Sequence, residues 1–98
     1  MTGVDLICEE RENQLEKWDS YHDDEHSNGE LAKVAASLAV EGTSATVTDL
    51  EGYGTNSDKW TLLDKYHDNR LRCLTIAGAL IAAEIDREIR LMIRREAL

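Results

Sequence analysis

The side chains best suited to chemistry in this 98-residue chain gather in one short polar segment, residues 22–26, followed by Glu30. Imidazole and carboxylate groups are ligands that divalent metals take, and a His-x-x-x-His spacing can place two rings on one side of a helical turn. The pattern allows a metal site, with these four ligands: Asp23, Asp24, His26 and Glu30. A capped, solvated acidic turn is the alternative that we favour, because the Glu of a His-Glu-x-x-His site is absent.

A second pattern could form a ligand pocket. Residues 21–23, Tyr-His-Asp, recur at 66–68, and each copy follows a Trp a few residues earlier. Since nothing else around the copies repeats, chance is an adequate explanation. If the fold brought the two copies together, their aromatic rings could stack on a base, and the nearby Arg70 and Arg72 could hold a phosphate. The candidate ligand-binding residues are Arg11, Trp18, His22, Asp23, Asp24, His26, Trp60, Asp68 and Arg70.

No catalytic residue is assigned. The sequence has no Gly-rich phosphate loop, nucleophile elbow or Cys–His pairing, so acyl transfer and P-loop chemistry are disfavoured. Cys8 and Cys73 are too few and too isolated to indicate a disulfide framework or a zinc ligand set, for which paired short spacings would be expected. We interpret both as reduced core residues.

The first positioning element is an amphipathic helix predicted over residues 4–18. Apolar residues recur there at three- and four-residue steps, and the inward face would hold Val4, Ile7, Cys8, Leu15 and Trp18. Arg11 falls on the same stripe. Either it snorkels from the helix edge, which we favour, or it is buried with a carboxylate partner.

Two further helices are predicted, over residues 28–41 and 61–95, with a loop at 42–60 between them. Ser27 and Glu30 have capping-box spacing, and Gly42 is a stop signal. The last helix would reach ~45–50 Å at 1.5 Å per residue, which is longer than its predecessors can cover. We therefore expect a homodimer or higher homo-oligomer through this helix, antiparallel or crossed, unless a bend near Asp68 shortens it.

Composition points to one small all-α domain over residues 1–98. Good helix formers dominate, Pro and Phe are absent, and no stretch approaches a membrane span. The net charge is −9, with −8 in residues 1–30 and +2 in residues 70–98. Duplex DNA would be repelled by most of this surface, whereas a basic host protein, or a ligand held by the Arg-rich end, fits the charge better. A solvated acidic face that keeps the protein soluble is an equally good interpretation. We expect a cytoplasmic protein that contacts neither duplex DNA nor membrane.

Several motifs together resemble a family of small phage and prophage proteins of unknown function. The matching residues are Glu10-Arg11, Gln14, Trp18, His22-Asp23-Asp24-x-His26, Gly29-Glu30-Leu31-Ala32, Ala35-Ala36, Asp68-x-Arg70 and the run from Ala77 to Arg87. The resemblance implies a phage accessory protein in the host bacterial cytoplasm that acts by binding, in counter-defence. It would engage a host protein or sequester a nucleotide-type signal.

A thinner similarity is to the all-α nucleotide pyrophosphohydrolases of MazG-like type. It rests on Glu30-Leu31-Ala32, although His26 and Ser27 stand where the motif has acids, and Glu84 and Asp86 are two apart rather than three. This similarity implies an enzyme that uses Mg²⁺ or Mn²⁺ to activate water against a phosphate. Its ligands would be Glu30, Asp23, Asp24 and Asp68 or Glu84, with His26 as the base.

Overall fold

The structure is a computed structural model that describes residues 1–17, 29–41, 43–44 and 68–97. Three helices account for most of these residues: α1 (Gly3–Lys17), α3 (Glu30–Val40) and α5 (Arg70–Ala97). No strand occurs in the described ranges. The all-α class and the long C-terminal helix are therefore confirmed.

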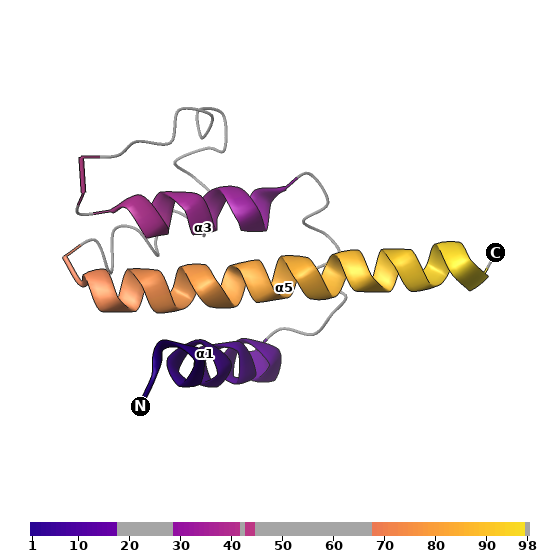
Figure 1. Cartoon of the computed structure of the whole chain (residues 1–98), viewed down its shortest axis with the longest axis horizontal. Helices are drawn as coiled ribbons and strands as arrows, with labels where there is room; N and C mark the ends of the chain where they lie inside the picture. Colours follow the sequence, from indigo (N-terminus) through magenta and orange to yellow (C-terminus); the bar gives the residue numbers. More distant parts are fainter. Residues whose placement is uncertain (18–28, 42, 45–67, 98) are drawn as a thin grey trace.

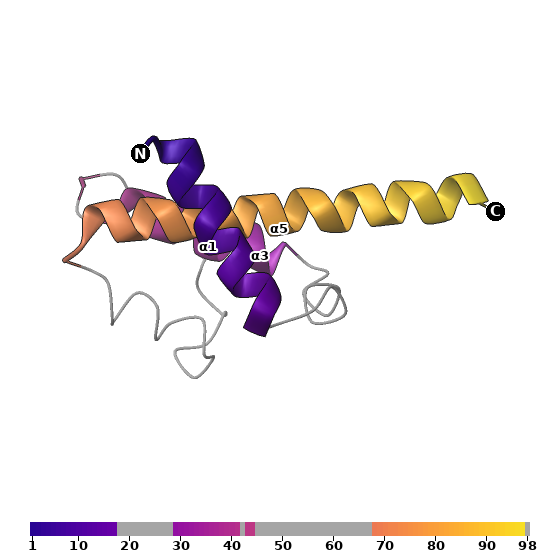
Figure 2. The same cartoon turned by 90° about the horizontal axis from the view of Figure 1, so that it is seen from below.

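The 28-residue helix α5 is the central element, and α1 and α3 pack on opposite sides of it (Figure 1). α3 runs antiparallel along the first half of α5, so that the last residues of α3 lie beside Arg70. α1 crosses α5 obliquely (Figure 2). The second half of α5 extends beyond α3 toward the C-terminus.

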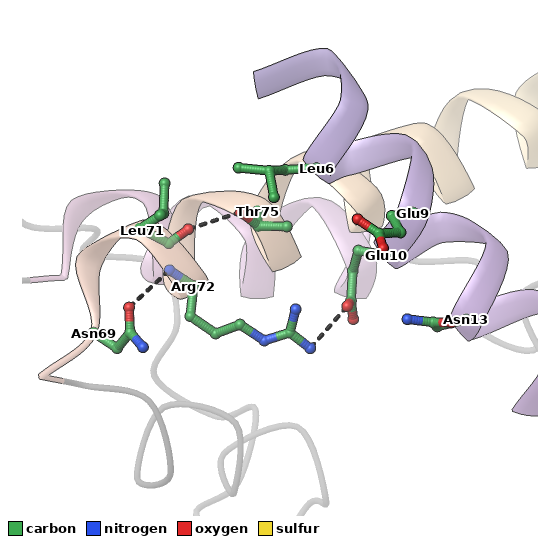
Figure 3. Close-up of a pocket in the computed structure, with 8 residues that line it drawn as sticks. All are labelled: Leu6, Glu9, Glu10, Asn13, Asn69, Leu71, Arg72 and Thr75. Carbon is green, nitrogen blue, oxygen red and sulfur yellow. Dashed lines mark hydrogen bonds and ion pairs between the residues drawn. The ribbon is translucent and has the colours of Figure 1, made fainter. Parts of the chain in front are cut away.

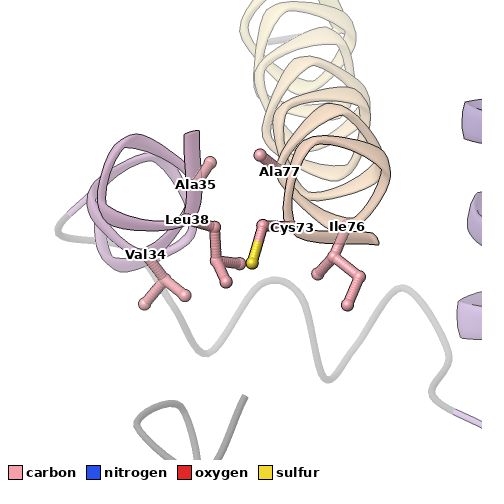
Figure 4. Packing of buried hydrophobic residues seen from close by; sticks show 6 residues of the cluster. All are labelled: Val34, Ala35, Leu38, Cys73, Ile76 and Ala77. Atoms are coloured by element: carbon pink, nitrogen blue, oxygen red, sulfur yellow. The ribbon is translucent and has the colours of Figure 1, made fainter. Parts of the chain in front are cut away.

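The α3–α5 contact forms the hydrophobic core (Figure 4). Leu38 and Cys73 are fully buried and lie side by side, and their neighbours are mostly small. Alanine side chains let two helices approach closely, which compensates for the lack of large aromatic residues. The cluster consists of Val34, Ala35, Leu38, Cys73, Ile76 and Ala77.

The start of α3 differs from the expected capping box. Gly29 is the N-cap, with a φ of 78°, and no side chain caps the helix. Glu30 is therefore the first helical residue. Capping by Ser27 would make Glu30 the third, so the capping-box prediction is wrong. A glycine takes this left-handed conformation without strain, which explains why the helix starts here. The predicted end is confirmed, since α3 stops at Val40.

The start of α5 also differs from the predicted one. Asp68 lies in a turn and Asn69 is not helical, so a continuous helix from 61 to 95 is wrong. Asn69 caps α5 instead, because its Oδ1 accepts a hydrogen bond of 3.0 Å from the backbone N–H of Arg72. The expected loop at 42–60, apart from Thr43 and Ser44, lies outside the described residues.

The inward face of α1 agrees with the prediction at Ile7, which is half-buried, but differs from it at Val4, Cys8 and Leu15. Val4 is 77% exposed, Leu15 is 49% exposed and Cys8 is exposed. Glu10 is buried, and Arg11 is half-buried. The reason is electrostatic: α5 offers an arginine and an aspartate to this side of α1, and Glu10 and Arg11 turn inward to meet them.

A reciprocal cap holds the beginning of α1. The backbone N–H of Asp5 donates to the Thr2 hydroxyl at 3.2 Å, and the Thr2 N–H donates to Asp5 Oδ2 at 2.8 Å. These bonds satisfy amide groups that have no partner inside a helix. The backbone hydrogen bond from Thr2, followed by that from its side chain, lowers the pKa of Asp5. The cap therefore weakens as pH falls through that lowered pKa.

α1 crosses α5 at Gly78. A Cβ built on Gly78 would lie 2.5 Å from Cδ1 and 2.7 Å from Cγ1 of Ile7. Both distances are shorter than carbon atoms tolerate, so the absence of a side chain at this position sets how closely the helices approach.

Gly78→Ala is expected to lower the free energy of unfolding by about 1–2 kcal/mol, because the clash with Ile7 exceeds the gain in helix propensity. In an Ile7→Ala background the same substitution should stabilise the protein, by up to about 1 kcal/mol, since only the propensity gain remains. Urea unfolding followed by circular dichroism measures both. An equal effect in the two backgrounds would show that Ile7 does not limit the approach.

Candidate functional site

The interface between α1 and α5 is joined by ion pairs. Arg11 donates from Nε and Nη2 to Asp86 Oδ2, at 3.3 and 3.0 Å. Its side chain is only 11% exposed, whereas that of Asp86 is 48% exposed. The favoured interpretation of Arg11 as a snorkelling residue is wrong, and the alternative of burial with a carboxylate is confirmed. Its guanidinium joins two helices.

A second pair, Arg72 and Glu10, borders a cavity of about 320 Å³ at the start of α5 (Figure 3). Arg72 Nη2 lies 2.7 Å from Glu10 Oε2, and the Glu10 side chain is 10% exposed. A buried carboxylate needs such a cation, because low polarity disfavours an uncompensated charge. The cavity is lined by Leu6, Glu9, Glu10, Asn13, Asn69, Leu71, Arg72 and Thr75.

Arg72→Met is expected to lower the free energy of unfolding by about 2 kcal/mol, because it leaves the Glu10 carboxylate buried without its cation. Adding Glu10→Leu should restore stability to within about 1 kcal/mol of the parent, since no charge then remains to be desolvated. Urea unfolding of the parent and both variants checks this. A double variant less stable than Arg72→Met would contradict it.

Arg70 and Arg72, at the start of α5, each join α5 to another helix. Arg70 is also a predicted ligand-binding residue. Arg70 Nη1 donates to the carbonyl oxygens of Ala39 and Glu41, both at 2.8 Å. These bonds satisfy carbonyl groups at the end of α3. Asp68 is exposed in the turn just before α5. The other predicted ligand residues lie outside the described residues: Trp18, His22, Asp23, Asp24, His26 and Trp60.

Of the predicted metal ligands, the structure describes Glu30, which is half-buried at the first position of α3. Within the described ranges, no three His, Cys, Asp or Glu side chains are grouped closely enough to hold a metal ion. Glu84, a ligand in the hydrolase hypothesis, accepts hydrogen bonds from Arg87 at 2.9 and 3.2 Å.

The outward face of α1 combines apolar and acidic side chains in two parallel rows. Spacings of four and eleven residues from the first member keep the apolar row on one side of the helix, and spacings of four, seven and eleven residues do the same for the acidic row. The apolar row is exposed and contains Val4, Cys8 and Leu15; the acidic row is exposed and contains Asp5, Glu9, Glu12 and Glu16. The sequence periodicity detects the apolar row but not the direction in which it faces.

A third face of α5 is covered by neither α1 nor α3. Its large apolar side chains are 40–54% exposed and follow a helical stripe: Leu74, Ile81, Ile85, Ile89 and Met92. We call this the α5 stripe. Toward the C-terminus it forms a groove of about 360 Å³, lined by Glu84, Ile85, Glu88, Ile89, Met92 and Arg95.

The two cysteines differ in environment. Cys73 is fully buried in the core, as predicted, whereas Cys8 is exposed, so its assignment to the core is wrong. Burial raises the pKa of the Cys73 thiol, and the nearby Glu41 carboxylate adds to this effect. The reactive thiolate of Cys73 therefore forms only at higher pH than usual.

In the folded protein, iodoacetamide is expected to alkylate Cys8 at neutral pH and to leave Cys73 unmodified. Mass spectrometry of proteolytic fragments locates the label, and unfolding in urea should make both thiols reactive. Alkylation of Cys73 at the rate of Cys8 under native conditions would contradict its burial.

None of the described helices is long and apolar enough to cross a membrane. Comparisons with protein-family models, curated proteins and solved structures found no match to this chain.

Proposed function

We propose that this chain is a phage accessory protein that acts by binding, and that its target in counter-defence is a basic host protein in the bacterial cytoplasm. Two observations support this function: the sequence resemblance and, above all, the outward face of α1. An exposed apolar row beside an acidic row is suited to a partner with an apolar patch bordered by Lys or Arg.

The geometry of α1 supports binding through this face. The charged residues Glu10 and Arg11 point inward and join α1 to α5, so they hold the helix in a fixed orientation. Val4 and Leu15 are consequently left outward, where they would be buried by a partner. Fully burying a side chain of this size contributes ~1.5–3 kcal/mol, and those already half-buried contribute less.

The charge distribution favours a basic partner. The chain carries a net charge of −9, and the exposed acids Glu9, Glu12 and Glu16 lie on one side of α1. Opposite charge accelerates encounter and selects among partners more than it adds affinity, and salt screens this effect. The predicted complex should therefore form more slowly as salt concentration rises.

The other sequence hypotheses have less support in the described residues. Sequestration of a nucleotide-type signal depends on the predicted ligand residues before Glu30 and at Trp60. The MazG-like hydrolase, with Mg²⁺ or Mn²⁺, would use Asp68 or Glu84 as a further metal ligand, and Glu84 here hydrogen-bonds to Arg87. We also propose self-association through α5, with the chain as a homodimer or higher homo-oligomer.

Affinity capture from bacterial lysate with the tagged chain tests the proposal. Glu16→Lys should reduce recovery of the host partner at least about tenfold at low salt, because it reverses a charge in the acidic row. Leu15→Asp should reduce recovery to a similar extent but with little dependence on salt. Mass spectrometry quantifies the recovered protein.

Asp68→Lys is the matched control, since it makes the same charge change at an exposed position in the turn before α5, outside α1. Recovery should remain unchanged with this variant. Equal loss with Glu16→Lys and Asp68→Lys would mean that net charge, rather than the face of α1, governs capture, and the proposal would fail.

A further inference from the structure

The second half of α5 lacks covering from the rest of the described chain. Its last buried residue is Arg87, and the helix continues to Ala97 with most side chains exposed. Figures 1 and 2 show this segment extending past both other helices. Ten residues of helix are marginally stable in water without packing, so an exposed apolar helix of this length is suited to a partner.

The groove on this segment has a particular arrangement of charge. Glu84 and Glu88 border its N-terminal part, and Arg95 borders its C-terminal part, with Ile85, Ile89 and Met92 between them. Arg95 is exposed and forms no ion pair with an acid in the part of the chain that the structure describes. Acidic and basic residues thus follow one another along the same edge of one apolar stripe.

From this arrangement we infer that the occupant of the groove is a second copy of this chain, packed antiparallel with its two-fold axis beside Arg90. The inference rests on the self-association proposed above and adds the surface, direction and register. In a two-fold pair the same surface of both copies meets itself. With the axis at residue 90, residue numbers that face each other across the two copies add up to about 180, so that residue 95 of one copy faces residue 85 of the other.

This register matches both charge and apolar surface. Arg95 of one copy lies alongside Glu84 and Glu88 of the other, and the reverse contact occurs at the opposite end. Ile89 lies at the axis, where it packs against the same region of the partner copy. Charged residues that flank an apolar seam select the direction of helix pairs in this way.

A parallel pair would fit poorly. In a parallel two-fold pair each edge of the stripe faces the opposite edge of the partner, so Arg95 would not meet Glu84 or Glu88, which lie on its own edge. Full overlap of two parallel helices would also bring the stripe near Leu74 into contact, close to where α1 crosses α5 at Gly78. In the antiparallel arrangement the overlap covers only about residues 83–97, beyond α3. α1 reaches this segment at Asp86, which lies outside the α5 stripe.

Sedimentation equilibrium of the full chain over a concentration series tests the inference. The parent should be a dimer, and Ile89→Glu should raise the dissociation constant at least about 100-fold. Leu74→Glu is the matched control: it places the same charge in the same stripe, but outside the overlap, and should leave the dimer intact. A monomeric parent, or equal effects of the two variants, would overturn the inference.

Cysteine crosslinking tests the register independently, in a Cys8→Ser background. Ile89→Cys should form a disulfide-linked dimer on mild oxidation, because residues 89 of the two copies lie near the axis. Glu96→Cys should not, since the two copies of residue 96 are twelve residues apart along the helix, or ~18 Å. Crosslinking at both positions indicates a parallel pair and overturns the register.

Failure here is distinguishable from failure of the host-binding proposal. A monomeric chain could still lose its host partner with Glu16→Lys, and a dimer could assemble while capture from lysate fails.

Charge reversal provides a last check. Arg95→Glu and Glu88→Arg should each weaken the dimer at least about tenfold, and the double variant should recover most of that loss. If the double variant does not recover dimer affinity, Arg95 of one copy does not lie beside Glu88 of the other.

Discussion

The packing of two helices on α5 is the constraint on which the rest of the structure depends. α3 contributes the core around Leu38 and Cys73, and α1 approaches closely at Gly78, where a side chain would collide with Ile7. Two helices can cover only part of a 28-residue helix that is apolar on several sides. The uncovered face is a direct consequence, and its large apolar residues are the feature from which self-association is inferred.

The way in which α1 is attached determines what it presents to solvent. Arg11 and Glu10 join α1 to Asp86 and Arg72 of α5, so the side of the helix that carries these two residues is the inward side. Partly buried ion pairs add little net stability, because desolvation offsets most of the attraction. Their effect here is to fix which side of α1 faces out, and the outward side carries Val4 and Leu15 beside the acids. The proposed host-binding face follows from this orientation.

The sequence pattern predicted the helical class, the end of α3 and the long C-terminal helix, because helix formers, stop signals and apolar periodicity depend on the local sequence. It did not predict the orientation of α1, since the choice between an apolar and a charged inward face depends on what α5 offers. The cap at Asn69 could have been recognised as a start signal, as could Gly29 before α3. The pocket proposed from the two Tyr-His-Asp copies remains a prediction, because most of its residues lie outside the described ranges.

Hydrogen exchange of α5, measured at several protein concentrations, tests the central claim most directly. If the end of α5 is held by a second copy, amide protection in residues 88–97 should fall as the protein is diluted below its dimer dissociation constant. Protection of the core residues 73–83 should stay constant, because α1 and α3 belong to the same chain. Equal protection of residues 88–97 at all concentrations, in a protein that remains monomeric, would contradict the account.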